Sequence, residues 1–342
     1  MKKKILIIGG AGFIGHNLAL FLKKKKFDVT IVDGLNVNNL DYLKKKYKEF
    51  ANPILTKKIL KNRLKLIKRN KIKIIKLDAR NYKSLSKTIN NSKAEVIVHL
   101  AAVSHANKSN KDPFNTFDHS FRTLENSLDN ARSRNNKIKK FIFLSSSMVY
   151  GNFKSPIVDE KTRCYPIGIY GSLKYAAEKL IIAYNQVFKL PYVIIRPSAL
   201  YGERCISRRV GQIFIENALT SKTIEINGNG NEKLDFTYID DLIQGIYQSI
   251  INSKANNQVF NLTYGNARRI KDLIKIIKKN FKNVKIVFKK RDKLTPYRGT
   301  LSTKKAKRVL NYNPKWPIEK GYQKYIDWYK SFYIKTKWIK IF

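Results

Sequence analysis

The sequence predicts an α/β protein built around a doubly wound parallel sheet. In the first half of the chain, short apolar segments typical of buried strands alternate with helix-forming segments, among them residues 16–25 and 116–132. This is the pattern of a parallel sheet covered by helices on both faces. The expected strands span residues 4–8, 29–32, 72–77, 95–100 and 141–144. Because ligands bind beyond the carboxyl ends of strands in such sheets, we expect functional residues to follow these segments.

The composition is that of a folded protein. Of the 342 residues, 43% are apolar and 12% aromatic, which is enough to bury a core. No apolar run approaches the roughly 20 residues of a membrane helix, so no membrane insertion is expected. The lysine-rich start followed by apolar residues 5–15 superficially resembles a signal peptide. However, the four glycines in this stretch fit the glycine-rich turn described below, so the expected location is the cytoplasm. Cys164 and Cys205 are expected to be free thiols without metal-ligand spacing, and no metal is expected.

The formal net charge of +46 would suit a nucleic acid or an anionic membrane surface as partner. Lysine is nevertheless spread along the whole chain, with one concentration of ten Lys and Arg residues at 57–76. No helix-turn-helix, zinc-finger or aromatic RNA-binding motif accompanies it. We therefore expect a solvated basic helix there and no specific nucleic-acid partner, although the field would attract an anionic substrate.

A glycine-rich turn follows the first expected strand. Gly9, Gly12 and Gly15 are spaced G-x-x-G-x-x-G between a strand and a helix. This spacing gives a tight turn, a close approach of the backbone to a pyrophosphate, and close helix packing. Phe13 and Ile14 lie within the turn and are expected at the same dinucleotide. The next strand ends in Asp33, whose carboxylate can accept from ribose hydroxyls and would repel a 2′-phosphate. The cofactor is therefore expected to be NAD rather than NADP.

Further candidates follow the third and fourth strands. Asp78 is a second acidic residue at a strand end, and the small Ala101 and Ala102 would let the backbone lie against a flat cofactor. Ser104 and His105 come next and are expected to reach the substrate. His105 is either a substrate contact or a hydrogen-bonded structural histidine.

The pair Tyr170 and Lys174 carries the expected chemistry. A tyrosine and a lysine four apart share one helix face, where the ammonium stabilises the phenolate. Such a phenolate can act as general base towards a sugar or alcohol hydroxyl. The same spacing begins at four other tyrosines, Tyr42, Tyr150, Tyr175 and Tyr333. Tyr170 is favoured because the candidate segments before it converge at the carboxyl ends of the expected strands. These segments are Gly9 to Gly15, Asp33, Asp78, Ala101 to His105 and Ser145 to Ser147.

These motifs together resemble the extended short-chain dehydrogenase/reductases, in particular the NAD-dependent nucleotide-sugar epimerase/dehydratase family with its UDP-glucose 4-epimerase-like proteins. The resemblance covers about residues 3–330 in the order that the family keeps. Besides the glycine turn and the tyrosine–lysine pair, it rests on His99-Leu-Ala-Ala102, Ser145-Ser-Ser-Met-Val-Tyr-Gly151, Arg196-Pro-Ser-Ala-Leu-Tyr-Gly202 and Asp235-Phe-Thr-Tyr-Ile-Asp-Asp241.

The resemblance implies a domain organisation. A Rossmann NAD-binding domain would span 1–196 with a long basic insertion at 36–71. A smaller, mixed α/β substrate domain would span 197–330, with some segments returning to the first domain, and a basic aromatic tail would occupy 331–342. In the second half, helices are expected at 203–218, 239–251, 270–280 and 318–330, and strands at 258–262 and 284–288. A homodimer is implied through the helices at 116–132 and 170–188.

The resemblance also assigns roles. Tyr170 would take the proton from the C4 hydroxyl of a nucleotide-diphosphate sugar, Lys174 would hold the nicotinamide ribose, and Ser146 would bond the C4 oxygen, with Ser147 as a secondary substrate contact. Family dehydratases carry an Asp-Glu pair just after the active-site threonine, and decarboxylases carry a Glu there. This chain has Met148. Since methionine transfers no proton, we expect a 4-epimerase working through a transient 4-keto sugar.

Two alternatives stay open within the family, a 4,6-dehydratase and an NAD-dependent sugar-nucleotide oxidoreductase. The segments 100–105 and 202–209 resemble the dehydratases. The diphosphate side also departs from the family pattern, because Ala199 and Leu234 replace the usual asparagine and arginine. The candidates to bind the diphosphate instead are Arg208, Arg209 and Arg298, since an arginine fork binds phosphate bidentately.

Overall fold

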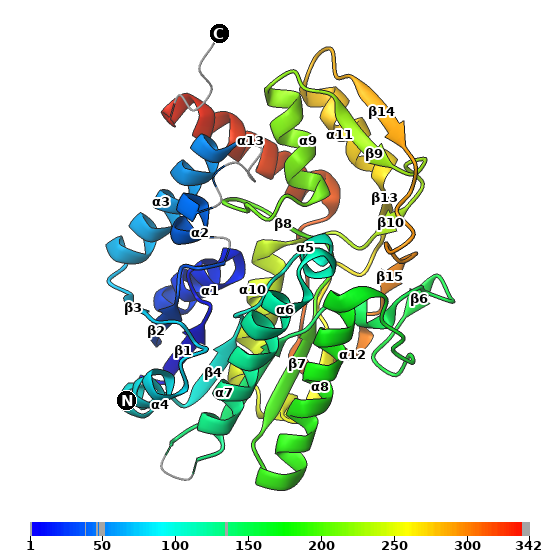
Figure 1. The fold of residues 1–342 in the computed structure, drawn as a ribbon. Helices are drawn as coiled ribbons and strands as arrows, with labels where there is room; N and C mark the ends of the chain where they lie inside the picture. The colour runs from blue at the N-terminus through cyan, green and yellow to red at the C-terminus, as the bar shows by residue number, and fades with distance from the viewer. Residues whose placement is uncertain (1, 38, 46, 48–51, 134–135, 337–342) are drawn as a thin grey trace.

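The computed structural model describes residues 2–37, 39–45, 47, 52–133 and 136–336, and a seven-stranded parallel sheet forms its centre (Figure 1). The strand order is β12-β7-β5-β4-β1-β2-β3. The order reverses between β1 and β4, which is where ligands bind in doubly wound sheets. All five strands expected in the first half of the chain are confirmed. The sheet consists of β1 (Lys4–Ile8), β2 (Asp28–Asp33), β3 (Lys73–Lys76), β4 (Val96–His99), β5 (Lys140–Leu144), β7 (Tyr192–Arg196) and β12 (Gln258–Asn261).

Helices cover both faces of the sheet because alternate side chains of the buried strands point to opposite sides. On one face, Ile5 and Ile7 of β1 belong to the core that includes α1 (Phe13–Lys24) and α10 (Ile239–Ile251). On the other face, Leu6 and Ile8 pack with α4 (Tyr82–Ser92), α7 (Thr123–Ala131) and α8 (Gly168–Phe188). The expected α/β fold class is thus confirmed.

The helix expected at 116–132 is interrupted. The chain forms α5 (Ala106–Lys111), α6 (Pro113–Phe117), a π-helical turn at Asp118–Arg122, and then α7. Such single π-turns inside α-helices are rare and occur often at functional sites. This one lies at the cleft described below.

A smaller layer of mixed structure lies over the carboxyl ends of the central strands (Figure 1). It contains β9 (Ile224–Asn227) paired in parallel with β14 (Ile286–Lys289), and the helices α9 (Val210–Leu219), α11 (Ile270–Asn280) and α13 (Ile318–Thr336). Strand β12, although late in the sequence, returns to the edge of the central sheet beside β7. Further elements of the second half are the helix α12 (Lys304–Leu310) and three short strand pairs. These pairs are β6 (Ile157–Val158) with β15 (Thr300–Leu301), β8 (Leu200–Tyr201) with β11 (Thr237–Tyr238) and β10 (Lys233–Leu234) with β13 (Arg268–Arg269).

The prediction of a helix from residue 203 was wrong at its start. Helix α9 begins only at Val210, and residues 203–209 form an irregular segment. Arg204 and Arg208 adopt positive φ angles of 64° and 51° there. Those angles are incompatible with a right-handed helix, so the helix begins only after Arg208.

The basic insertion forms α2 (Leu40–Lys45) and α3 (Pro53–Arg69). The expected solvated helix is only half correct, because α3 buries one face, including Ile59, Leu60, Arg63 and Ile67. Residues 38, 46 and 48–51 of the insertion, and 337–342 of the expected tail, lie outside the described residues, while 331–336 continue α13. Within the described ranges, no helix combines the length and apolarity needed to cross a membrane.

Candidate active site

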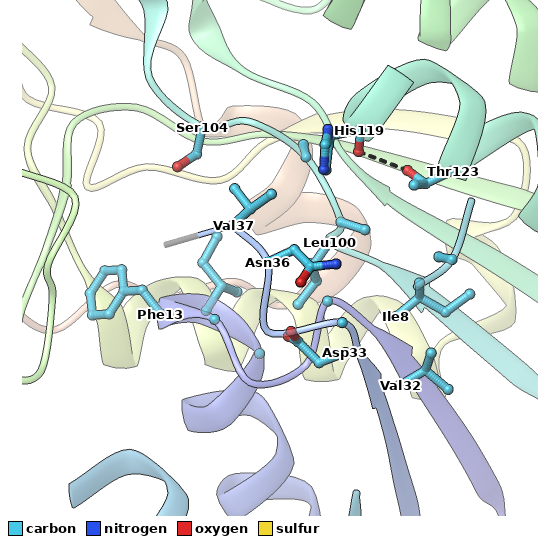
Figure 2. A pocket seen from close by; sticks show the side chains of 18 of the residues that line it. Ile8, Phe13, Val32, Asp33, Asn36, Val37, Leu100, Ser104, His119 and Thr123 are labelled. Atoms are coloured by element: carbon cyan, nitrogen blue, oxygen red, sulfur yellow. Dashed lines mark hydrogen bonds between the residues drawn. The ribbon is translucent and has the colours of Figure 1, made fainter. Parts of the chain in front are cut away.

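The glycine turn after β1 forms one wall of an open cleft (Figure 2). Gly9 has φ +80°, and a Cβ there would lie 2.6 Å from the backbone nitrogen of Ala101; a Cβ on Gly15 would lie 2.5 Å from the Cα of Gly10. Any side chain at these two positions would therefore displace the backbone. The residues expected at the cofactor that line this cleft are Gly9, Gly12, Phe13, Ile14, Gly15, Asp33, Asp78, Ala101 and Ala102.

Asp33 is fixed at the end of β2 by main-chain donors. Its carboxylate accepts hydrogen bonds from the backbone nitrogens of Ala11, at 2.9 Å, and Leu35, at 2.8 Å. Burial raises the pKa of Asp33, while these two hydrogen bonds act in the opposite direction. The Asp33 carboxylate thus links the glycine turn, through Ala11, to the segment that follows β2, through Leu35.

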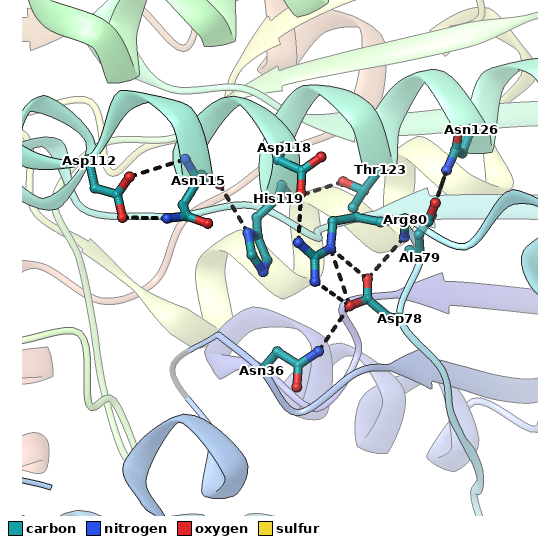
Figure 3. Close-up of polar contacts among 10 residues, drawn as sticks. All are labelled: Asn36, Asp78, Ala79, Arg80, Asp112, Asn115, Asp118, His119, Thr123 and Asn126. Carbon is teal, nitrogen blue, oxygen red and sulfur yellow. Dashed lines mark hydrogen bonds and ion pairs between the residues drawn. The ribbon is translucent and has the colours of Figure 1, made fainter. Parts of the chain in front are cut away.

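Asp78 belongs to a network that the sequence did not predict (Figure 3). Arg80 forks onto Asp78, with Nη2 2.7 Å from Oδ2, and its Nη1 lies 2.6 Å from Oδ2 of Asp118 on the π-helical turn. Asn36 donates to Asp78 at 3.0 Å. The hydrogen bond from Arg80 lowers the pKa of Asp78, so the carboxylate is ionised at neutral pH. Arg80 therefore ties the end of β3 to the turn that carries His119.

Tyr170 and Lys174 line a small cavity between α8, β5 and the π-helical turn. The Lys174 ammonium donates to the carbonyl of Leu144 at 2.6 Å and lies 4.5 Å from the ring centre of Phe143. Burial lowers the pKa of Lys174 to about 8, and the nearby Glu178 opposes that shift. The amine is thus held at the carboxyl end of β5, on the helix face that also bears Tyr170.

Ser146, Ser147 and Met148 form a tight turn against the start of α8. Ser146 and Ser147 are buried, and the Ser146 Oγ accepts a hydrogen bond from the Met148 nitrogen at 3.2 Å. The 3₁₀ turn Ser147–Tyr150 packs on α8 so closely that a Cβ on Gly171 would lie 2.9 Å from the carbonyl oxygen of Met148. Residue 148 is therefore positioned next to the helical turn that carries Tyr170.

A buried ion pair joins α8 to strand β7. Arg196 of β7 forks onto Glu178 of α8, with Nη2 2.6 Å from Oε2 and Nε 3.0 Å from Oε1. The third guanidinium nitrogen donates to the Tyr150 hydroxyl at 2.9 Å, and Ser145 also donates to Glu178. Glu178 lies one helical turn after Lys174. The Arg196–Glu178 ion pair therefore fixes the part of α8 that carries Lys174 against the carboxyl end of β7.

Three arginines that have no acidic partner among the described residues lie near one another at the smaller layer. The Nε atoms of Arg291 and Arg298 are buried and lack hydrogen-bond partners among the described residues. Burial, and then the charges of Arg209 and Arg291, lower the pKa of Arg298 to about 10. Arg209 lines the cofactor cleft and donates to the carbonyl of Ser104 at 3.3 Å. This group of cations, Arg209, Arg291 and Arg298, is the basic cluster.

His105 faces the same cluster. It caps the start of α5 without a side-chain hydrogen bond, and its buried Nδ1 has no partner within the described part of the chain. Burial, then Arg209, Lys108 and Arg208, lower its pKa to about 4. Arg208 is held through its main-chain nitrogen, which donates to Gln212 at 2.8 Å. The histidine is therefore neutral at physiological pH and surrounded by cations.

Several cleft residues were missed by sequence reasoning. His119 and Thr123 reach the cleft from the π-helical turn and the start of α7, and Asn36 lies at the end of β2. Arg63 reaches it from α3. No local motif marks these positions. Arg63 is one of the ten basic residues at 57–76, a stretch expected to form a solvated helix.

A parallel sheet with a glycine cradle, an acidic β2 terminus and a tyrosine–lysine helix defines a dinucleotide-dependent enzyme class. The chain belongs to the NAD dependent epimerase/dehydratase family, whose model matches residues 5–263. The expected family and the NAD cofactor are therefore confirmed. The cradle at Gly9 and Gly15 and the carboxylate of Asp33 fit this dinucleotide.

Individual relatives narrow the comparison. A putative UDP-glucose 4-epimerase from Methanocaldococcus jannaschii is 30% identical over 333 residues, covering 96% of this chain and 98% of that protein. A dTDP-D-glucose 4,6-dehydratase from Dictyostelium discoideum is 29% identical over 284 residues, covering 76% and 58%. The crystal structure of UDP-glucuronic acid 4-epimerase from Bacillus cereus in complex with UDP-glucuronic acid and NAD matches with a TM-score of 0.84 at 28% identity, covering 97% of this chain and 100% of that one.

Proposed function

We propose that this protein is an NAD-dependent UDP-sugar 4-epimerase that inverts the C4 hydroxyl through a transient 4-keto sugar. The 4-epimerases among its relatives, which match nearly the whole chain, support the substrate class. NAD, when bound, supplies reversible oxidation of the sugar at C4. The protein's own residues must then move one proton, bind the sugar nucleotide and avoid further chemistry on the ketone.

Tyr170 is the proposed proton carrier. Its phenolate takes the proton of the C4 hydroxyl and returns it to the C4 oxygen when the ketone is reduced on its opposite face. Lys174, held by the Leu144 carbonyl, keeps a positive charge near the phenolate. Ser146 accepts from the Met148 nitrogen, so its own hydroxyl hydrogen can donate to the C4 oxygen.

Met148 is the observation that carries the choice of reaction. The Met148 carbonyl packs against Gly171, the residue directly after Tyr170, so residue 148 lies next to the proposed base. Dehydratases and decarboxylases of the family have a residue with a carboxylate at this position. Loss of water across C5 and C6 needs an acid and a base, and a thioether provides neither. Reduction of the ketone from the other face needs no additional acidic group, so Met148 favours inversion at C4 over loss of water or decarboxylation.

The basic cluster is the proposed diphosphate site. Arg209 and Arg298 were expected there, and Arg291 joins them. These arginines are half-buried and have no acidic partner among the described residues, so an anion supplied from outside would stabilise them. A UDP diphosphate would supply that anion, and His105 would face it or the adjoining sugar.

The test is to incubate the protein with a panel of UDP-, dTDP- and GDP-sugars and follow the products by NMR. The proposal expects interconversion of C4 epimers of a UDP-sugar without net NADH formation. An accumulating 4-keto-6-deoxy sugar would establish the dehydratase alternative, and accumulating NADH would establish the oxidoreductase.

A homodimer is proposed through the helices near the π-helical turn and α8. Phe114 is 81% exposed and Val187 68% exposed, and Phe117 and Phe188 are also exposed on the same helices. A second copy covering these side chains would remove them from water. Light scattering after size exclusion should give twice the chain mass of 39.8 kDa; a monomer would overturn this proposal.

A further inference from the structure

Arg63 occupies an unusual position for a residue of a basic surface stretch. Its side chain is 1% exposed on the buried face of α3. Nε lies 3.0 Å from the carbonyl oxygen of Arg204, and Nη2 donates to the same oxygen. The remaining nitrogen, Nη1, is buried without a hydrogen-bond partner among the described residues. One side of the guanidinium is therefore anchored, and the other has no bond.

A second cation lies beside it under the glycine turn. Arg204 Nε is 3.2 Å from His16 Nε2, and His16 Nδ1 is 2.8 Å from the carbonyl oxygen of Gly12. Burial, then the charges of Arg63 and Arg204, lower the pKa of His16, so this imidazole is neutral. It donates through Nδ1 to Gly12 and accepts through Nε2 from Arg204. The underside of the turn thus carries two cations and a neutral histidine.

The described residues supply no paired anion for these charges. Asp33 is the carboxylate whose charge acts on Arg63, yet its oxygens accept from Ala11 and Leu35. No ion pair to Arg63 is found within the described chain. Burying a cation against a single carbonyl is costly without an opposite charge.

Arg63 lines the cofactor cleft together with Gly12, Phe13 and Asp33. The glycine turn and the start of α1 form the place where a dinucleotide pyrophosphate binds. We propose that Arg63, supplied by the insertion helix α3, is a pyrophosphate ligand of NAD, with Nη1 donating to a phosphate oxygen while Nε and Nη2 hold the Arg204 carbonyl. This assignment depends on the cofactor and not on which sugar reaction the protein catalyses.

The experiment measures binding to the full-length protein after removal of its cofactor. Calorimetry compares ADP-ribose, which has the pyrophosphate, with adenosine, which lacks it. Arg63→Met should weaken ADP-ribose binding roughly 10- to 100-fold, as expected for a lost hydrogen bond to a charged group, and leave adenosine binding unchanged. Arg63→Lys keeps the charge and should lose less than the Met variant. Arg69→Met, an exposed arginine on the same helix, is the matched control and should change neither.

Each of the following results would overturn the assignment. Unchanged ADP-ribose binding in Arg63→Met would mean that Nη1 meets no phosphate. Equal weakening of ADP-ribose and adenosine would mean that Arg63 only shapes the site. A loss confined to NADP, measured in parallel, would place the guanidinium at the ribose 2′ position instead. If Arg63→Met does not fold, Arg63→Gln, which also removes the charge, is measured in the same way, and unchanged ADP-ribose affinity in that variant would contradict the proposed contact.

Discussion

Replacing Arg298 by methionine should change ligand binding and stability in opposite directions. The Nε of Arg298 is buried without a partner among the described residues, and burial together with Arg209 and Arg291 lowers its pKa to about 10. The cation is therefore unfavourable in the ligand-free protein and favourable once a diphosphate is present. Methionine has a similar reach and no charge, so it removes both effects.

The expected magnitudes follow from these contacts. A hydrogen bond to a charged group contributes about 1.5–3 kcal/mol, so Arg298→Met should weaken UDP binding roughly 10- to 100-fold. Removing an unpaired, partly buried charge should stabilise the ligand-free protein by about 1 kcal/mol. In a chain of this size that corresponds to a rise in melting temperature of about 1–2 °C.

Calorimetric titration with UDP and thermal unfolding without ligand measure the two effects. Arg163→Met, which removes an exposed arginine outside the basic cluster, is the control and should alter neither. Unchanged UDP affinity in Arg298→Met would refute the diphosphate assignment. A joint loss of affinity and melting temperature would show that Arg298 supports the fold rather than the ligand.

The remaining predictions concern α8. Tyr170→Phe should lower turnover about 10²- to 10⁴-fold with the NAD content per chain unchanged, whereas the control Tyr175→Phe, in a pair of the same spacing, should retain turnover. Steady-state kinetics and cofactor quantitation measure these effects. A fully active Tyr170→Phe would exclude Tyr170 as the proposed base. Glu178→Gln leaves the Arg196 guanidinium buried without a full partner and should lower the free energy of unfolding by about 3–5 kcal/mol in urea titrations; a change under about 1 kcal/mol would contradict this. Burial lowers the pKa of Lys174 to about 8, so above that pH the folded chain binds fewer protons than the unfolded chain and this group's contribution to stability rises with pH up to the ordinary lysine range. Lys174→Met should therefore flatten the pH dependence of the unfolding free energy between about pH 8 and about pH 10, and an unaltered slope would contradict the assignment.

Local sequence determined the parts of this protein whose physics is local. The spacing of Gly9, Gly12 and Gly15 after an apolar strand sufficed to predict the cradle, because only glycine tolerates the φ of +80° and the close approach at Gly9. Asp33 could be placed at a strand end because strands of a parallel sheet end at one edge. Both statements need only the residues themselves and their nearest neighbours along the chain.

Tertiary structure decided everything that depends on residues distant in sequence. Tyr170 shares its spacing with four other tyrosines, and it is the packing of α8 against the turn at Ser147–Tyr150 that brings it to the strand ends.

Arg63 has no local mark that distinguishes it from the lysines around it. Its burial follows from α3 packing on α1 and on the 203–206 segment, about 140 residues away, as its bond to Arg204 shows. The basic cluster likewise joins Arg209 to Arg291 and Arg298, whose missing partners become visible only when all neighbours are known. Periodicity and motif spacing report on a residue's own helix or strand, whereas charge balance and burial depend on the whole fold.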